Sequence, residues 1–242
     1  MLARIYKYHH EVNSYDVVKF VAILAMIIDH VGFYFVDNND YFRAIGRLAA
    51  PLFFFITGHV SNYNIRSSIL IYGLIIMGVS YYWEGVWFIN ILLVFVGIKW
   101  ILNRWDPSQE NIIIIIVIFL LLYFLSSFTR SVIEYGLFGL AYAICGRLLA
   151  SRTKMVVVSV LLAGTLFNQF YYYLFFDDIY LSVLISMVGI SLFYIMLFFQ
   201  YQVFSVHPMS KNSILVVSRY SLEIYFWHLL MFEIVSKLIL AQ

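Results

Sequence analysis

The chain has 242 residues, of which 64% are hydrophobic and only 12% are charged, whereas an average soluble domain has about 25% charged residues. Long apolar runs recur along the whole chain, so the sequence predicts an all-α, polytopic integral membrane protein without a soluble domain of any size. The net charge of +2 is small and scattered, which argues against nucleic-acid binding. With Cys145 as the single cysteine, neither an internal disulfide nor a thiol-based metal site is expected.

The apolar runs predict a helical bundle of about nine transmembrane helices. Eight to ten is the full range, because three runs are near the shortest length that crosses ~30 Å of hydrocarbon. The predicted spans are Val17–Val36, Ala44–Val60, Ser67–Tyr82, Val86–Ile101, Ile112–Phe128, Val132–Ala150, Met155–Phe175, Ile179–Gln200 and Leu215–Leu240. No repeat or long linker divides them, which predicts a single transmembrane domain over residues 1–242.

The loops between these spans alternate in charge. One set carries mainly lysine and arginine: Arg4, Lys7, Arg66, Lys99, Arg104, Arg147, Arg152, Lys154, Lys211 and Arg219. The other set is mainly acidic, apart from one arginine: Asp37, Asp40, Glu84, Arg130, Asp177 and Asp178. Because basic loops stay in the cytoplasm, the pattern predicts an N-in, C-out topology, and Met1–Val12 is expected to be a short cytoplasmic lead-in.

The first span carries four ionisable residues, Asp16, Lys19, Asp29 and His30. Such residues are costly in lipid, so they mark a functional site by default. Lys19 and His30 are separated by roughly 16 Å along a helix and lie about 20° off a common face. We therefore predict that Lys19 holds a charged part of a ligand near one membrane surface while His30 presents an imidazole deep inside.

Other spans also place polar groups at middle-to-outer depth. These groups are Arg43, Arg47, Glu84, Asn90, Glu134, Tyr135, Asn168, Gln169, His228 and Glu233. An unpaired charge at that depth costs several kcal/mol, so the groups should face each other or a wet cavity. Their convergence predicts a site more strongly than any one residue does.

Structural explanations remain open for several of these residues. Asp29 and Arg47 fit an ion pair that holds the first two spans together, and His228 fits a hydrogen bond between helices. Pro51 lies within the second predicted span, where a proline either makes a packing kink or borders a cavity.

Three motifs resemble those of the TraX family. They are Asp16-x-x-Lys19…Met26-x-x-Asp29-His30-x-Gly32, then Arg43-x-x-Gly46-Arg47-x-x-x-Pro51-x-Phe53-x-Phe55-x-x-Gly58, and Glu134-Tyr135-Gly136-x-x-Gly139. The family belongs to a wider set of transmembrane acyltransferases, with the acyltransferase-3 proteins and heparan-α-glucosaminide N-acetyltransferase. Lys19-x10-His30 is similar to the Arg/Lys-x10-His motif of that set, and the stretch that ends Ser221-Leu-Glu-Ile-Tyr225-Phe-Trp-His228 is similar to its closing motif. Glu134 stands where the TraX pattern has Asp.

The resemblance implies a membrane-bound O- or N-acetyltransferase of the bacterial inner membrane. It would move an acetyl or other acyl group from cytoplasmic acetyl-CoA to an amine or hydroxyl at the outer side. The acceptor is a protein such as pilin, a lipid or a surface glycan, and the resemblance does not choose among them. No metal is expected, and a homodimer remains open.

The expected roles follow from the chemistry of acyl transfer. The reaction needs a base for the acceptor proton and donors for the developing oxyanion. His30 is the natural base, because an imidazole titrates near physiological pH. Asp29 points about 100° away from His30 on a regular helix, so it is expected to meet Arg47 or to hold His30 through water. Arg47, Arg43 or Asn90 would stabilise the oxyanion, and a covalent acetyl-imidazole intermediate stays open.

The remaining polar residues are assigned to donor or acceptor binding. The catalytic set is His30, Asp29 and Arg47. The cytoplasmic mouth for coenzyme A phosphates comprises Lys19, Asp16, Lys99, Arg104, Arg147 and Arg152. The acceptor-binding set is Arg43, Asn90, Glu134, Tyr135 and His228. A small proton-coupled transporter is the leading alternative, since intramembrane Asp, His and Arg also mark ion pathways, and a non-catalytic scaffold is a third.

Overall fold

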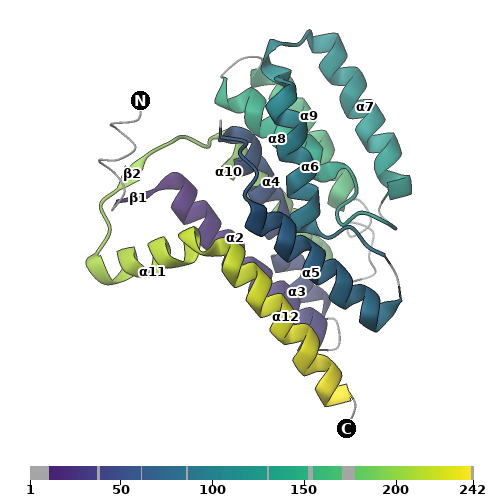
Figure 1. The fold of residues 1–242 in the computed structure, drawn as a ribbon. Coiled ribbons are helices and arrows are strands. Elements are labelled where there is room, and N and C mark those ends of the chain that lie inside the picture. Colours follow the sequence, from purple (N-terminus) through teal and green to yellow (C-terminus); the bar gives the residue numbers. More distant parts are fainter. Residues whose placement is uncertain are drawn as a thin grey trace. The chain divides into compact units, whose positions relative to one another are not determined.

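The structure is a computed structural model that describes residues 11–36, 39–60, 62–85, 87–129, 131–151, 155–170 and 178–240. The described chain is mainly α-helical, as the sequence predicts (Figure 1). Two short strands, β1 (Val12–Asn13) and β2 (Val203–Phe204), pair antiparallel. Contacts group the chain, which the sequence treats as one domain, into two compact units. Unit 1 comprises Met1–Leu52 and Phe198–Gln242, and unit 2 comprises Phe53–Leu197.

Three helices of the described residues are long and apolar enough to cross a membrane, judged by length and composition. These are α2 (Ser14–Phe35), α7 (Ile112–Thr129) and α10 (Ile179–Leu197). Shorter apolar helices cover Ser67–Trp83, Phe138–Ala150 and Met155–Phe170. The chain is thus a helical membrane protein, while the count of about nine spans and the N-in orientation stay predictions.

Unit 1 is built around α2, whose start is determined locally. The Asn13 side chain accepts hydrogen bonds from the backbone N–H groups of Tyr15 and Asp16, and the Asp16 carboxylate accepts one from the Asn13 N–H. This reciprocal capping satisfies N–H groups that have no partner within the helix. Three further helices pack against α2: α3 (Asp40–Gly46), α11 (Pro208–Arg219) and α12 (Ser221–Leu240).

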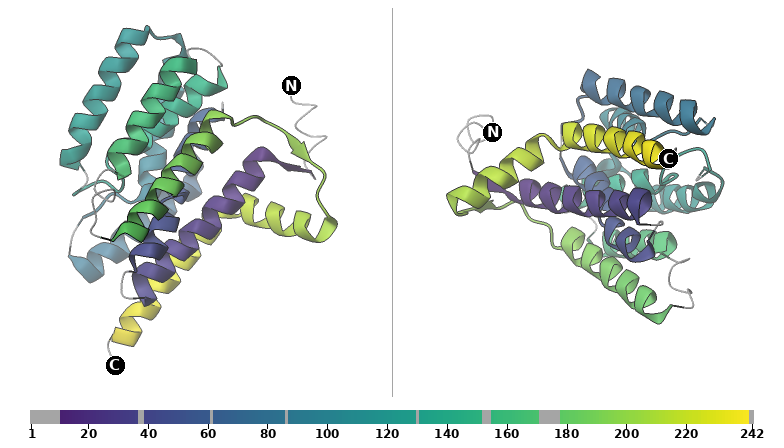
Figure 2. Two further views of the ribbon diagram at one scale, coloured as in Figure 1. Left: turned by 180° about the vertical axis from the view of Figure 1, so that it is seen from behind. Right: turned by 90° about the horizontal axis from the view of Figure 1, so that it is seen from below.

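The first and last of these helices run in the same direction. Ser218, just before α12, bonds Asp16 near the start of α2, and Phe232 in α12 packs against Phe35 at the end of α2. The early contact on α2 involves the region just before α12, and the late contact on α2 involves a later residue of α12. The two helices are therefore parallel, as Figures 1 and 2 show.

Two predicted spans are each divided into two helices. The run Ala44–Val60 contains the end of α3 and the whole of α4 (Ala49–His59), and Leu215–Leu240 contains the end of α11 and α12. Pro51 lies in the first turn of α4, where its missing N–H forfeits no intrahelical hydrogen bond. Reading Ala44–Val60 as one continuous span with an internal proline was therefore wrong, because this proline marks a helix start.

In unit 2, α8 is the central helix and packs against α6, α7 and α9. Close approach of backbones holds it to α4: a Cβ on Gly58 would collide with the Ala143 carbonyl, and one on Gly146 with the Phe55 carbonyl. Small residues allow such close contacts between apolar helices. Close packing matters in lipid because no hydrophobic force drives helices together there. The helices of unit 2 after α4 are α5 (Ser67–Glu84), α6 (Ile91–Arg104), η1 (Pro107–Gln109), α7, α8 (Phe138–Ala150), α9 (Met155–Phe170) and α10.

Candidate functional site: a histidine pair in unit 1

Two half-buried imidazoles, from His30 on α2 and His228 on α12, are in direct contact. Nδ1 of His30 lies 2.7 Å from Nε2 of His228. The ring centroids are 4.9 Å apart and the planes are inclined by 22°. The two nitrogens therefore lie between the centroids, and the rings meet edge to edge in nearly one plane. This is the geometry of an N–H···N hydrogen bond.

The partner on the far side of His228 assigns the protons. Nδ1 of His228 lies 2.7 Å from the carbonyl oxygen of Ile224, one turn earlier on α12. A carbonyl only accepts, so this nitrogen carries the proton, and Nε2 of a neutral His228 is an acceptor. Nδ1 of His30 is then the donor between the rings. The lone pair of a neutral His30 is consequently on Nε2, the nitrogen turned away from His228.

Aromatic rings surround the pair. Tyr34 and Tyr225 lie edge-on to His30 with centroid distances of 6.2 and 6.4 Å, and Phe232 lies edge-on to His228 at 5.5 Å. All of these rings come from α2 and α12. They restrict the rotation of both imidazoles and leave the polar contacts of the pair in an apolar environment.

Asp29 points toward α3 rather than toward His30. Its Oδ2 lies 3.5 Å from Nη1 of Arg43, and the Arg43 guanidinium also lies 4.9 Å above the ring of Phe33. Gly46 permits this approach, because a Cβ there would collide with the Asp29 side chain. The sequence predicted that Asp29 meets Arg47 or holds His30 through water, whereas the ion pair of Asp29 in the described residues is with Arg43.

Arg43 therefore belongs to the surroundings of the histidine pair. It pairs with Asp29, the residue before His30 on α2. Oδ1 of Asp29 is buried and has no hydrogen-bond partner among the described residues, so this carboxylate is incompletely satisfied. A cation beside an imidazole base is suited to stabilise negative charge that develops during a reaction.

Asp16, assigned to the donor mouth, has both carboxylate oxygens occupied. One accepts a hydrogen bond from the Ser218 hydroxyl at 2.6 Å and the other from the Asn13 N–H at 3.1 Å. Its observed contacts thus join α11 to the start of α2. Lys19 lies one turn further along α2 and is half-buried.

Two of the residues assigned to acceptor binding, Asn90 and Glu134, organise the start of α6. Asn90 accepts hydrogen bonds from two N–H groups of the first turn of α6 and donates to the Gly73 carbonyl at 2.6 Å. Glu134 accepts from the Ile91 N–H at 2.7 Å. Tyr135, next in the chain, has a φ of +61°, a left-handed conformation rare outside glycine. These contacts explain why polar residues lie here without invoking a substrate.

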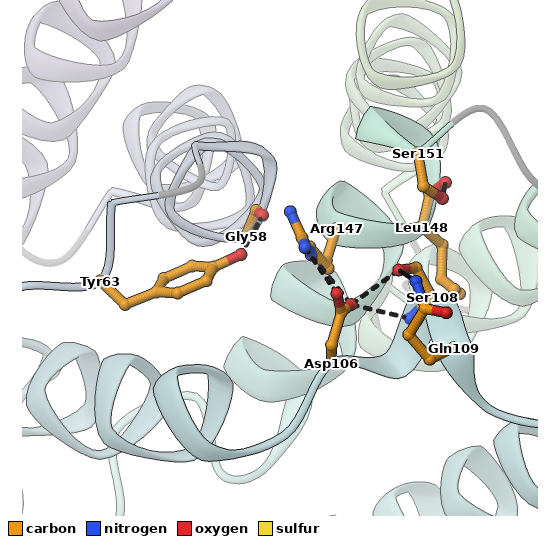
Figure 3. A network of polar contacts seen from close by, with 8 residues as sticks. All are labelled: Gly58, Tyr63, Asp106, Ser108, Gln109, Arg147, Leu148 and Ser151. Carbon is orange, nitrogen blue, oxygen red and sulfur yellow. Dashed lines mark hydrogen bonds and ion pairs between the residues drawn. The ribbon is translucent and has the colours of Figure 1, made fainter.

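Arg147 is held at the other end of unit 2 by Asp106 (Figure 3). Its Nε and Nη2 donate to the two carboxylate oxygens at 3.0 and 2.6 Å. These hydrogen bonds lower the pKa of Asp106 to about 2. Ser108 donates to the same carboxylate, and the nearby Tyr63 hydroxyl donates to the Gly58 carbonyl.

Three of the predicted donor-binding cations share this end of unit 2. Asp106 follows α6 directly and binds the last turn of α8, so the ends of these helices are adjacent. Lys99 donates to the Asn64 carbonyl at 3.3 Å, and the Arg104 guanidinium lies 4.2 Å above Trp100. Arg152 lies outside the described residues, and Lys19 belongs to unit 1.

The sequence did not predict that His30 and His228 form a pair, nor that Arg43 rather than Arg47 binds Asp29. The sequence did contain one indication of the pairing between Asp29 and Arg43. Pro51 is favoured in the first turn of a helix, and a helix that starts just before Pro51 leaves Arg43 on a separate short helix beside Asp29.

Comparison with known proteins finds a family match over most of the chain and a relative over a smaller part of it. The sequence model of the family described as TraX protein matches residues 14–236. The uncharacterized protein RP591 of Rickettsia prowazekii (strain Madrid E) is 37% identical over 67 residues, which are 28% of this chain and 27% of that protein. The match therefore spans about a quarter of that relative. No solved structure matches.

Proposed function

The chain belongs to the TraX family, and we propose that it is a membrane acyltransferase with His30 as its general base. The motif resemblance supports placing it in the wider set of transmembrane acyltransferases. The observation that carries the proposal is the hydrogen bond between His30 and His228, because it leaves Nε2 of His30 as the proton-accepting atom. A half-buried imidazole with that nitrogen available is what a general base requires.

The proposed reaction transfers an acyl group from a thioester. Nε2 of His30 takes the proton from the amine or hydroxyl of the acceptor as its nitrogen or oxygen forms a bond to the acyl carbon. The carbon–sulfur bond breaks, and the leaving thiolate of coenzyme A receives the proton from His30. The products are the acylated acceptor and the free thiol, and the imidazole returns to its neutral form.

Arg43 is the proposed electrostatic partner in this step. Its guanidinium is paired with Asp29, the residue next to His30 on α2, so it is suited to stabilise negative charge on the acyl oxygen. Asp29 holds Arg43 through their ion pair, which makes Asp29 a positioning residue in the proposal. The oxyanion role was expected for Arg47, Arg43 or Asn90, with Arg47 in the catalytic set, and the ion pair with Asp29 favours Arg43 instead.

Acetyl-CoA is the proposed donor. Lys19 in unit 1 is one proposed contact for its phosphates, and Lys99 and Arg104 in unit 2 are predicted contacts that the substitutions below test separately. Arg147 is a weaker candidate, because Asp106 already engages its guanidinium on two sides. The proposed acceptor is an amine or hydroxyl of a pilin-type protein, a lipid or a surface glycan on the outer side of a bacterial inner membrane.

The test is acyl turnover by the purified full-length protein in liposomes. Radiolabelled acetyl-CoA is added with lipid and protein fractions of bacterial membranes as acceptors, and labelled product and released thiol are quantified. We expect both to appear together in equal amounts. Uptake of a solute or of protons into the liposomes without any acyl turnover would favour the transporter instead.

A second arm tests the donor contacts. Neutralising Lys99 and Arg104 should raise the KM for acetyl-CoA with a smaller effect on kcat, as expected for lost ground-state binding. An unchanged KM would remove these residues from the donor site while leaving the reaction itself in place.

A further inference from the structure

We infer that His228 is a positioning residue that selects the reactive tautomer of His30 and shares the proton that His30 takes up. This inference rests on the proposed function, because it gives His228 a role in the same reaction. The sequence assigned His228 to acceptor binding or to a structural hydrogen bond. The observed chain of contacts, from the Ile224 carbonyl through His228 to His30, gives it a different task.

The contacts of the pair determine the tautomer of His30. An isolated neutral imidazole carries its proton on either nitrogen. The Ile224 carbonyl holds the proton of His228 on Nδ1, and Nε2 of His228 in turn holds the proton of His30 on Nδ1. A backbone carbonyl on α12 thereby determines, through two rings, which nitrogen of His30 bears the lone pair.

The two imidazoles can also share the proton that is transferred during the reaction. When Nε2 of His30 binds the acceptor proton, the proton on Nδ1 can move across the 2.7 Å contact to Nε2 of His228. His30 is then neutral with its proton on Nε2, and His228 is an imidazolium whose two N–H groups both have acceptors. When His30 delivers its Nε2 proton to the thiolate, the proton on His228 returns. Both rings end neutral, and no other reactant is needed.

A second imidazole suits an apolar site better than the carboxylate that often orients a catalytic histidine. A carboxylate next to His30 would place a permanent charge in the membrane, which is costly without a cation. The adjacent carboxylate, Asp29, is instead paired with Arg43 on α3. Two neutral imidazoles carry no charge at rest, and the charge that appears during reaction is spread over both rings.

The groups that face the pair come from three helices. Tyr34 on α2 and Tyr225 on α12 flank the rings, and Arg43 with Asp29 lies on the α3 side. Glu233 is buried on α12, five residues beyond His228. The remaining helix against α2, α11, makes its polar contact at Asp16, near the start of α2.

Nitrogen NMR of the full-length protein tests the tautomer without reference to activity. The protein is labelled with ¹⁵N-histidine in detergent micelles, and the His30 signals are assigned by their loss in His30→Gln. We expect the His30 proton on Nδ1 in the wild type and a mixture of both tautomers in His228→Ala. A wild-type His30 with its proton on Nε2 would overturn the inference.

Activity measurements on His228→Gln test the sharing of the proton. The amide oxygen of glutamine can accept a hydrogen bond from the Nδ1–H group of His30, but it cannot be protonated by that group. We therefore expect His228→Gln to keep the His30 tautomer, to lower kcat by about tenfold, as loss of one charge-assisted hydrogen bond would, and to shift the acid limb of the pH profile of kcat. His228→Ala should lower kcat further, by about 10²-fold. His207→Gln, at an exposed histidine of the same unit, is the matched control and should match the wild type.

The outcomes separate the inference from the proposed function. A His228→Gln protein with the wild-type kcat and pH profile would overturn proton sharing while acyl transfer stands. Absence of acyl transfer in the wild type would instead contradict the proposed function, and the NMR result would still decide the tautomer. Thermal unfolding midpoints within a few degrees of the wild type exclude misfolding as the cause of lost activity.

Discussion

The two units of this protein use their polar residues differently. In unit 2, Asn90 and Glu134 are occupied by the start of α6, and Arg147 is occupied by Asp106. In unit 1, the hydrogen bonds of the histidine pair place the lone pair of His30 on Nε2, and the adjacent Asp29 carboxylate has a buried oxygen without a hydrogen bond among the described residues. The polar residues of unit 2 thus have partners that build the fold, whereas unit 1 keeps polar atoms that the proposed reaction can use. From residue type and predicted membrane depth alone, the polar residues of both units had been assigned to a single site.

The largest difference between the units should be seen in activity. His30→Ala should lower acyl transfer by about 10²–10⁴-fold, because it removes the general base, and should leave acetyl-CoA binding intact. Asn90→Ala in unit 2 should retain turnover in the protein that stays folded. Labelled-product formation per folded molecule measures both. His207→Ala is the matched control at an exposed histidine of unit 1. If Asn90→Ala lost as much turnover as His30→Ala at unchanged stability, the contrast between the units would be broken.

The next effect concerns the stability of unit 2. Gly58→Ala places a Cβ against the Ala143 carbonyl, which forces α4 and α8 apart and should destabilise the fold by about 1–3 kcal/mol. Gly97→Ala on α6 is the matched control, because its Cβ would meet nothing within 4 Å. The midpoint of thermal unfolding in detergent should fall for the first variant and not for the second. Equal midpoints would show that close packing of α4 on α8 contributes little.

A smaller loss of stability is expected at the start of α6. Glu134→Ala removes the acceptor of the Ile91 N–H, so it should cost about 1 kcal/mol, the typical worth of a helix cap, with kcat unchanged. Glu134→Asp, which restores the residue of the TraX pattern, keeps the carboxylate and serves as the comparison. A normal unfolding midpoint together with a raised KM for the acceptor would instead return Glu134 to a substrate-binding role.

The smallest effect should follow the charge of Asp106. Its pKa in the folded protein, about 2, is below its ordinary value of 3.8 because of the hydrogen bonds from Arg147 and Ser108. The ion pair therefore contributes its full stabilisation above pH 3.8, and that contribution disappears as the pH falls toward 2. The effect is small because the carboxylate is a third exposed. Asp106→Asn should lower the midpoint of thermal unfolding at pH 7. It should also remove the decrease of that midpoint that the ion pair causes as the pH falls from 3.8 toward 2. An unchanged midpoint at pH 7 would show that the ion pair does not stabilise the fold.

The expectations that held depend on local features of the chain. The apolar composition predicted a helical membrane protein, and the motif resemblance predicted the TraX family, whose model matches residues 14–236. The first predicted span, Val17–Val36, is close to α2, because the capping residues Asn13 and Asp16 lie within one turn of its start. The prediction of one span over Ala44–Val60 failed where a proline at a helix start was interpreted as a kink.

The sequence by itself determined the class of protein, the family and the helix on which His30 lies, since hydropathy, capping and periodicity act over a few residues. Only the tertiary structure decided that His30 meets His228, 198 positions away, and that Asp29 meets Arg43. Those contacts depend on how each helix is rotated about its own axis and how far it slides along its neighbour. A rotation of one residue, about 100°, would turn either imidazole away from the other, and no local pattern encodes that rotation.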